Sequence, residues 1–144
     1  MASSYTWFYW AILSAIFAAL TAIFAKVGIS NVNSDVATLI RTAIIFVILS
    51  VYIWLTRQWQ NPLTLKASTW IFLGLSGLAT GASWVCYFRA LQIGEASKVA
   101  PVDKFSLVLV AIFATIFLGE RPAPKDWLGI ALVASGVLVL AFKR

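Results

Sequence analysis

Five apolar segments, each close to the length of a helix that crosses a lipid bilayer, dominate this 144-residue chain. A helix needs about 20 apolar residues to cross roughly 30 Å of hydrocarbon, whereas the strands of a membrane barrel are about 10 residues long and alternate in polarity. Only 11% of the residues are charged, against about 25% in a soluble domain. We expect an all-α, polytopic membrane protein with a single domain, residues 1–144, and spans at about 5–25, 36–55, 70–94, 99–118 and 127–142.

The polar residues exclude several functional classes. The net charge of +6 is spread along the chain, without the basic run that is typical of a nucleic-acid site. We therefore expect the basic residues to contact membrane lipid and not nucleic acid. Histidine, the commonest general base, is absent, and Cys86 is the single cysteine. Nothing resembles a P-loop, a metal site or a nucleophile–base pair, so we expect neither an enzyme nor a cofactor.

The basic residues are divided almost evenly between the two membrane sides that five alternating spans define. Four lie on the N-terminal side and seven on the other, and omitting the three that lie within spans leaves four on each. So weak a bias permits insertion in either orientation. The first side holds Arg57, Lys66, Arg121 and Lys125, and the second holds Lys26, Arg41, Arg89, Lys98, Lys104, Lys143 and Arg144.

Charged side chains inside the spans are the first candidate site. Arg41, Arg89, Asp103 and Lys104 all lie one or two turns inside a span, towards the same side as Lys26. An arginine at the bilayer centre costs about 3 kcal/mol on insertion scales, so such residues need a partner or a function. Two interpretations stay open. Asp103 pairs with Arg41 or Arg89 for structural reasons, or the excess positive charge binds an anionic or zwitterionic solute.

The third segment carries two stripes at helical spacing. Gly77 and Gly81 lie on one face with Trp84, where small residues allow close helix packing, and Gly129 and Gly136 offer a similar face in the last segment. Ser76, Thr80, Ser83 and Tyr87 form a polar stripe that either lines a cavity or bonds back to its own helix. The candidate substrate-binding or gating residues are Arg41, Thr80, Ser83, Trp84, Tyr87, Arg89, Asp103, Lys104 and Ser106.

A longer pattern resembles a known family. It comprises Ala18-ALTAIFAKVGI, Asp35-VATLIRT, Gly77-LATGASWVCYFRALQIGEASKVAPVDKFSLVLVAIFATIFLGE-Arg121 and Trp127-LGIALVASGVLVL. These segments are similar to the EamA family of the drug/metabolite transporter superfamily and cover nearly the whole chain. Small multidrug resistance proteins of that superfamily use a glutamate in their first helix, but the first segment here has no acid.

The resemblance implies export or uptake of metabolites, often amino acids, by alternating access. Most members have ten helices in two inverted five-helix repeats, and this chain resembles the short, single-repeat form. Longer relatives often carry a proline in the middle of the fourth helix, where this chain reads Lys104-Phe-Ser106-Leu-Val. We expect Pro101 to lie in the first turns of that span, where its missing N–H does little harm.

The leading hypothesis is a multi-pass transporter of the prokaryotic inner membrane that moves a metabolite, an amino acid or an organic anion. Inverted repeats require a second copy in the opposite orientation, so we expect an antiparallel homodimer. The alternative is an accessory or heteromeric membrane subunit that transports nothing alone.

Overall fold

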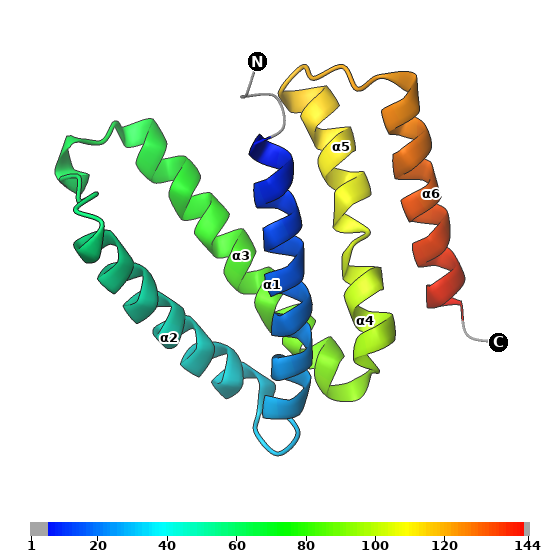
Figure 1. Ribbon diagram of the computed structural model, residues 1–144, viewed down its shortest axis with the longest axis horizontal. Helices are drawn as coiled ribbons and strands as arrows, with labels where there is room; N and C mark the ends of the chain where they lie inside the picture. Colours follow the sequence, from blue (N-terminus) through cyan, green and yellow to red (C-terminus); the bar gives the residue numbers. More distant parts are fainter. Residues whose placement is uncertain (1–5, 143–144) are drawn as a thin grey trace. The chain divides into compact units, whose positions relative to one another are not determined.

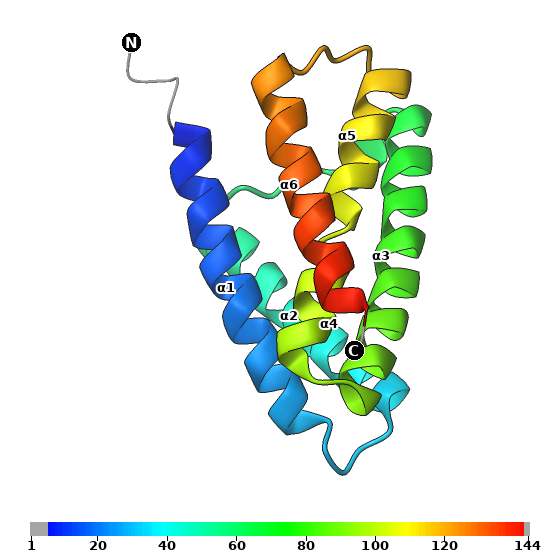
Figure 2. The same ribbon diagram turned by 90° about the vertical axis from the view of Figure 1, so that its right-hand side faces the viewer.

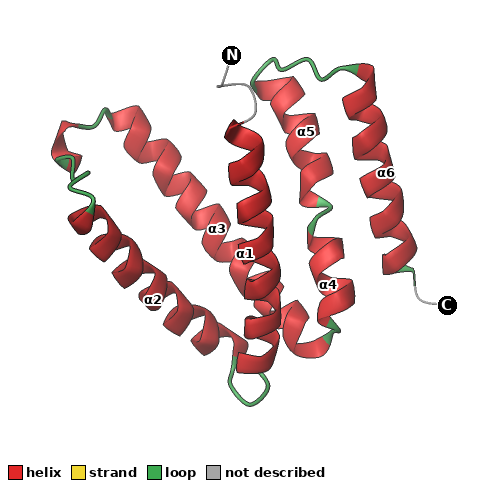
Figure 3. Ribbon diagram, in the orientation of Figure 1, coloured by secondary structure: helices red, strands yellow, loops and turns green. Residues whose placement is uncertain are grey.

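The computed structural model describes residues 6–142 and consists of helices joined by short loops, as Figure 3 shows. Tyr5, Lys143 and Arg144, which entered the sequence predictions, lie outside the described residues. The helices are α1 (Thr6–Gly28), α2 (Ser34–Leu55), the 3₁₀ helix η1 (Pro62–Thr64), α3 (Ala67–Ile93), α4 (Ala96–Asp103), α5 (Ser106–Phe117) and α6 (Pro124–Ala141).

Within residues 6–142, five helical segments are long and apolar enough to cross a membrane, which confirms the predicted polytopic all-α class. Four of them are the single helices α1, α2, α3 and α6, and the fifth, Ala96–Phe117, contains both α4 and α5. Most large apolar side chains of the described residues point outward, including Phe24, Phe46 and Phe72. Such a surface is solvated by lipid, and helices are the structures that satisfy every backbone group within it.

The chain forms two compact units and passes from one to the other twice, inside α1 and at the end of α3. The α2–α3 unit, Ile23–Gln92, contains the end of α1, all of α2 and nearly all of α3. The α4–α6 unit contains α1 up to Ala22 and the chain from Ile93 onward. In the α4–α6 unit, α6 packs beside both α4 and α5, as Figures 1 and 2 show.

The helix ends follow local chemistry. The side chain of Asn33 accepts hydrogen bonds from the backbone N–H groups of Asp35 at 2.8 Å and Val36 at 3.4 Å, and so starts α2. Pro124 occupies the first turn of α6, where the Asp126 carboxylate accepts the N–H of Ala123 at 2.8 Å. Each of these residues satisfies or removes an N–H group that the helix itself leaves without a partner.

The fourth span contains an unexpected interruption. Lys104 and Phe105 separate α4 from α5 (Figure 1), and the N–H groups of Lys104, Phe105 and Leu107 bond three residues back instead of four. Pro101 lies in the first turns of the span, as predicted, but α4 begins at Ala96 and encloses the proline, so the prediction that its missing N–H does little harm was wrong. Proline has no N–H for the carbonyl four residues earlier and crowds it, which weakens the helix between Ser97 and Pro101, the turn before the interruption.

Gly119 ends the fourth span with a left-handed backbone, φ +66°, and has no atom within 4 Å of where a Cβ would lie. Because an L-residue in this conformation costs about 1 kcal/mol or more, we expect Gly119→Ala to lower the free energy of unfolding by about that amount. Gly74 is a matched control, since it lies inside α3 with equally open space. Gly74→Ala should raise stability by about 0.5–1 kcal/mol.

Thermal unfolding in detergent micelles measures both variants. A Gly119→Ala protein that is as stable as wild type would show that the turn relaxes to a right-handed backbone at no cost.

Candidate functional site: an ion pair and an aromatic-bound arginine at one end of the α2–α3 unit

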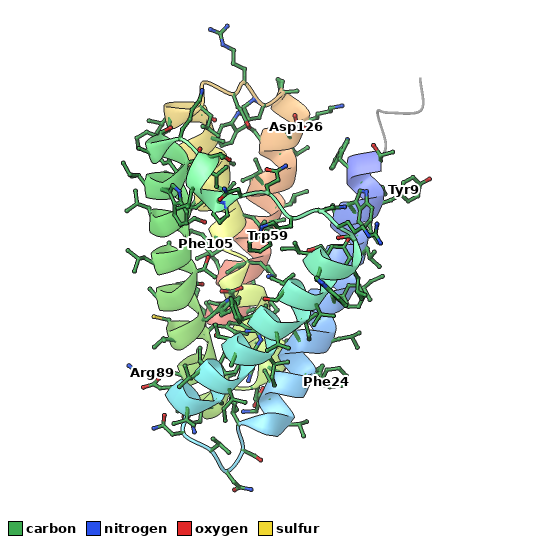
Figure 4. All side chains as sticks on the ribbon, turned by 90° about the vertical axis from the view of Figure 1, so that its left-hand side faces the viewer. Tyr9, Phe24, Trp59, Arg89, Phe105 and Asp126 are labelled. Atoms are coloured by element: carbon green, nitrogen blue, oxygen red, sulfur yellow. The ribbon has the colours of Figure 1, made fainter. Side chains whose placement is uncertain are left out.

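Polar side chains from α1, α2 and α3 gather at one end of the α2–α3 unit. The helices α2 and α3 approach each other where Figure 4 labels Arg89 and diverge towards η1. The small core of the unit lies at the same end and includes Ile29, Phe88 and Leu91, each at most 2% exposed. The charged groups at this end are exposed or half-buried beside the best-packed part of the unit.

An ion pair joins the start of α2 to the end of α3. Arg89 donates from Nε to Oδ1 of Asp35 at 3.1 Å and from Nη2 to Oδ2 at 2.7 Å. This two-point geometry orients both planar groups and is stronger than a single contact. Asp35 also lies in the first turn of α2, where a negative charge is favoured by the helix dipole.

The structure gives Arg89 a partner that the sequence analysis did not name. We expected Asp103 to pair with Arg41 or Arg89, but Arg89 pairs with Asp35, and Asp103 contacts Lys104 at 3.4 Å. Asp35 was not among the expected partners, because it lies just before the predicted second span, residues 36–55. The signal for this pair was the alternation of the spans. In a chain whose spans alternate in direction, the start of the second span and the end of the third lie on the same side of the membrane.

Arg41 lies against aromatic rings. Its guanidinium carbon is 4.5 Å from the centroid of the Trp84 ring and 5.3 Å from that of Phe88. These distances are typical of cation–π attraction, which is strongest over tryptophan. The side chain is half-buried, and no hydrogen bond or ion pair joins it to another of residues 6–142. The structure thus brings together Arg41 and Trp84, two of the predicted site residues.

Two further contacts hold the same end of the unit together. Lys26 donates from Nζ to the carbonyl oxygen of Leu91 at 2.6 Å. Gln92 donates from Nε2 to the carbonyl oxygen of Val32 at 2.9 Å. These bonds link the end of α3 to the end of α1 and to the loop before α2, so three helix ends meet in one polar layer.

The polar stripe of α3 has mixed surroundings. The Thr80 hydroxyl donates to the carbonyl oxygen of Ser76 at 2.8 Å, so it is satisfied by its own helix. Ser83 is exposed, and Tyr87 is half-buried with its ring edge-to-face against Phe88. A role for this stripe in binding stays a prediction.

The remaining site candidates lie in the α4–α6 unit at the interruption of the fourth span. Asp103 ends α4, Lys104 caps it, and Ser106 begins α5. A charged pair is therefore held at a break in a membrane-spanning segment, where backbone groups are also released from regular helix bonds. Association of Asp103 and Lys104 with Arg41 and Arg89 stays a prediction.

The predicted packing glycines have no close neighbours within their own units. A Cβ built on Gly77, Gly81, Gly129 or Gly136 would meet no atom within 4 Å. These faces are therefore available to another helix, and their role in packing stays a prediction. Residues 6–142 also contain no group of three or more His, Cys, Asp or Glu side chains that could hold a metal ion.

Comparison with known proteins matches this chain to one protein family. The profile of the EamA-like transporter family matches residues 5–142. A protein of Sinorhizobium sp., named "uncharacterized transporter in cobO 3'region", is 56% identical over 138 residues, which are 96% of this chain and 98% of the relative.

More distant relatives carry a more specific name. A Yersinia pestis (strain Pestoides F) protein is 28% identical over 85 residues, which are 58% of this chain and 75% of the relative. It is named "probable 4-amino-4-deoxy-L-arabinose-phosphoundecaprenol flippase subunit ArnE", and a Yersinia pseudotuberculosis relative has the same name and the same identity of 28%. No solved structure matches the chain.

Proposed function

We propose that this chain, which belongs to the EamA-like transporter family, moves a small solute across the bacterial inner membrane by alternating access. The observation that carries the proposal is the family match, which includes all five candidate membrane spans. The 56% identical relative is also named a transporter and is similar along nearly its whole length. We expect the solute to be a metabolite, either an amino acid or another organic anion.

The working unit in this proposal is an antiparallel homodimer. Transporters with inverted repeats place their binding site where two oppositely oriented halves meet, and this chain supplies five spans, the number in one such half. The open faces at Gly77, Gly81, Gly129 and Gly136 would let helices of a second copy approach closely. The weak charge bias between the two sides permits both orientations.

A heteromeric assembly is the second candidate, because the relatives named ArnE are called subunits of a flippase. In that case the chain would need a different protein for activity and would transport nothing when purified alone. Cysteine crosslinking tests the homodimer. Antiparallel pairs between identical chains would support it, and a crosslinking map that contains parallel pairs alone would contradict it.

The ion pair supplies a mechanism for closing one side of the membrane. Asp35–Arg89 and the bond from Gln92 to Val32 hold the ends of α2 and α3 together, while the two helices diverge towards η1 (Figure 1). Alternating access requires such contacts to break when that side opens. We therefore infer that this polar layer is the gate on the side of Arg89.

Transport by the purified protein in liposomes tests the proposal. Amino acids and organic anions are screened with and without a pH gradient, beside Asp103→Asn. We expect uptake above that of empty liposomes, and a loss of about tenfold or more in the variant, because Asp103 is a carboxylate within a membrane span. Equal uptake by variant and wild type would remove Asp103 from the mechanism. If the purified protein gives no uptake while co-reconstitution with a second five-span protein does, the homodimer is wrong.

A further inference from the structure

We propose that Arg41 is the residue that binds an anionic group, a carboxylate or a phosphate, of the transported solute. The proposal rests on the transport function argued above and names the chemical class of its substrate. The aromatic rings of Trp84 and Phe88 support the arginine from one side, and its N–H groups supply the contacts to the anion.

The first step is the charge balance of the α2–α3 unit. Asp35 is the one carboxylate in residues 23–92, whereas Lys26, Arg41 and Arg89 are cations at the same end of the unit. Both oxygens of Asp35 are bound by Arg89, at 3.1 and 2.7 Å. The unit therefore has no further carboxylate for Arg41, although a cation inside a membrane span needs compensation.

The second step is how Arg41 is held. Cation–π contacts with Trp84 and Phe88 fix the plane of the guanidinium but do not neutralise its charge. A guanidinium carries five N–H donors in a rigid fork that matches carboxylate and phosphate oxygens. Since no hydrogen bond joins Arg41 to another of residues 6–142, the whole fork is available to a ligand.

The third step is the depth and the space beside Arg41. The residue lies seven positions after Ser34, which places it about 10 Å along the helix from the start of α2. On α3 the face that carries Trp84 continues to Gly81 and Gly77, where the space within 4 Å is open. A small solute bound through its anion at Arg41 would therefore meet glycine backbone on α3.

The same fork would also bind the phosphate of a lipid head group, so the experiment separates the two sources. The full chain is placed in nanodiscs of phosphatidylcholine alone, and its thermal unfolding midpoint is measured against acetate and inorganic phosphate at constant ionic strength. A second series uses nanodiscs with phosphatidylglycerol and no added anion. Arg41→Gln and Arg41→Lys are compared with Arg57→Gln, a control arginine in the loop after α2.

We expect acetate or phosphate to raise the unfolding midpoint of the wild type and of Arg57→Gln in a saturable way. Arg41→Gln should bind the same anion about tenfold more weakly or worse, because a charge-assisted contact is lost. Arg41→Lys keeps the charge but lacks the fork, so its affinity for the anion should lie between those of the wild type and Arg41→Gln. This second variant keeps the test decisive if the glutamine variant does not fold.

Three results would overturn the proposal. Soluble anions could stabilise wild type and Arg41→Gln equally, or have no effect on either protein. Alternatively, phosphatidylglycerol alone could stabilise the protein through Arg41, which would make this arginine a lipid contact.

The failure of this inference is distinguishable from a failure of the transport function. If Arg41→Gln takes up a neutral or cationic solute as fast as the wild type does, the transport function stands and the anion site at Arg41 is wrong. If anions bind through Arg41 but the purified protein takes up no solute, the anion site stands and transport by this chain alone is wrong.

Discussion

Replacing Arg89 with alanine should impair transport, because it removes the two-point ion pair that joins the start of α2 to the end of α3. If the pair is also the gate of one side, its loss shifts the balance between the two access states, and a shift of roughly tenfold is usual for such couplings. We expect uptake in liposomes to fall by about that factor in Arg89→Ala and in Asp35→Ala.

A double-mutant cycle shows whether the two residues act together. The variant that carries both Asp35→Ala and Arg89→Ala should be less impaired than the sum of the single effects, since neither charge is then left alone. The exchanged pair, Asp35→Arg with Arg89→Asp, should recover part of the activity. Arg57→Ala is the control, because Arg57 forms no ion pair within residues 6–142. Additive losses in the cycle would show that the contact has no energetic role.

Replacing Pro101 with alanine should make α4 and α5 one continuous helix. Alanine restores an N–H that can bond to the carbonyl of Ser97 and removes the crowding of that carbonyl by the proline ring, one turn before the three-residue bonds at Lys104 and Phe105. The variant should gain up to about 3 kcal/mol of stability, the amount that an interior proline costs a helix. Transport should fall, because the interruption places Asp103 and Lys104 at a break in the span.

Spin labels measure the geometry directly. Cysteines at Ala96 and Phe117, in a Cys86→Ser background, report the length of the 22-residue fourth span. An unbroken helix of that length is about 33 Å long, and the distance should be closer to that value in Pro101→Ala than in wild type. Pro122→Ala, in the loop before α6, is the control. An unchanged distance in Pro101→Ala would mean that packing of α6 against α4 and α5 imposes the break.

Most of the fold could be predicted from the sequence, because a segment that crosses lipid must meet only a few physical requirements. A span must be long and apolar, and its backbone must be helical, so the lengths of the five segments were enough to predict the helices. The bounds were less accurate, since α3 begins at Ala67 and the fourth span at Ala96, both earlier than expected. Polar residues such as Ser68 and Ser97 extend these helices beyond the apolar core that defines a span.

The candidate site was predictable only in part. The alternation of the spans placed Lys26, Arg41 and Arg89 on one side of the membrane, and these residues do lie at one end of the α2–α3 unit. It could not reveal that Arg89 selects Asp35 or that Arg41 rests on Trp84. Such contacts depend on how α2 and α3 rotate about their own axes, and residues more than 40 positions apart have no local signal for that rotation.

The sequence alone therefore determined the number of spans, the helical class and the family, because each depends on local apolar length or on a pattern of residues read along the chain. The tertiary structure decided the partner of Arg89, the aromatic support of Arg41 and the break after Asp103. The first two depend on side chains that meet only when helices pack. The break lies inside one continuous apolar segment, so the apolar pattern along the chain does not specify it.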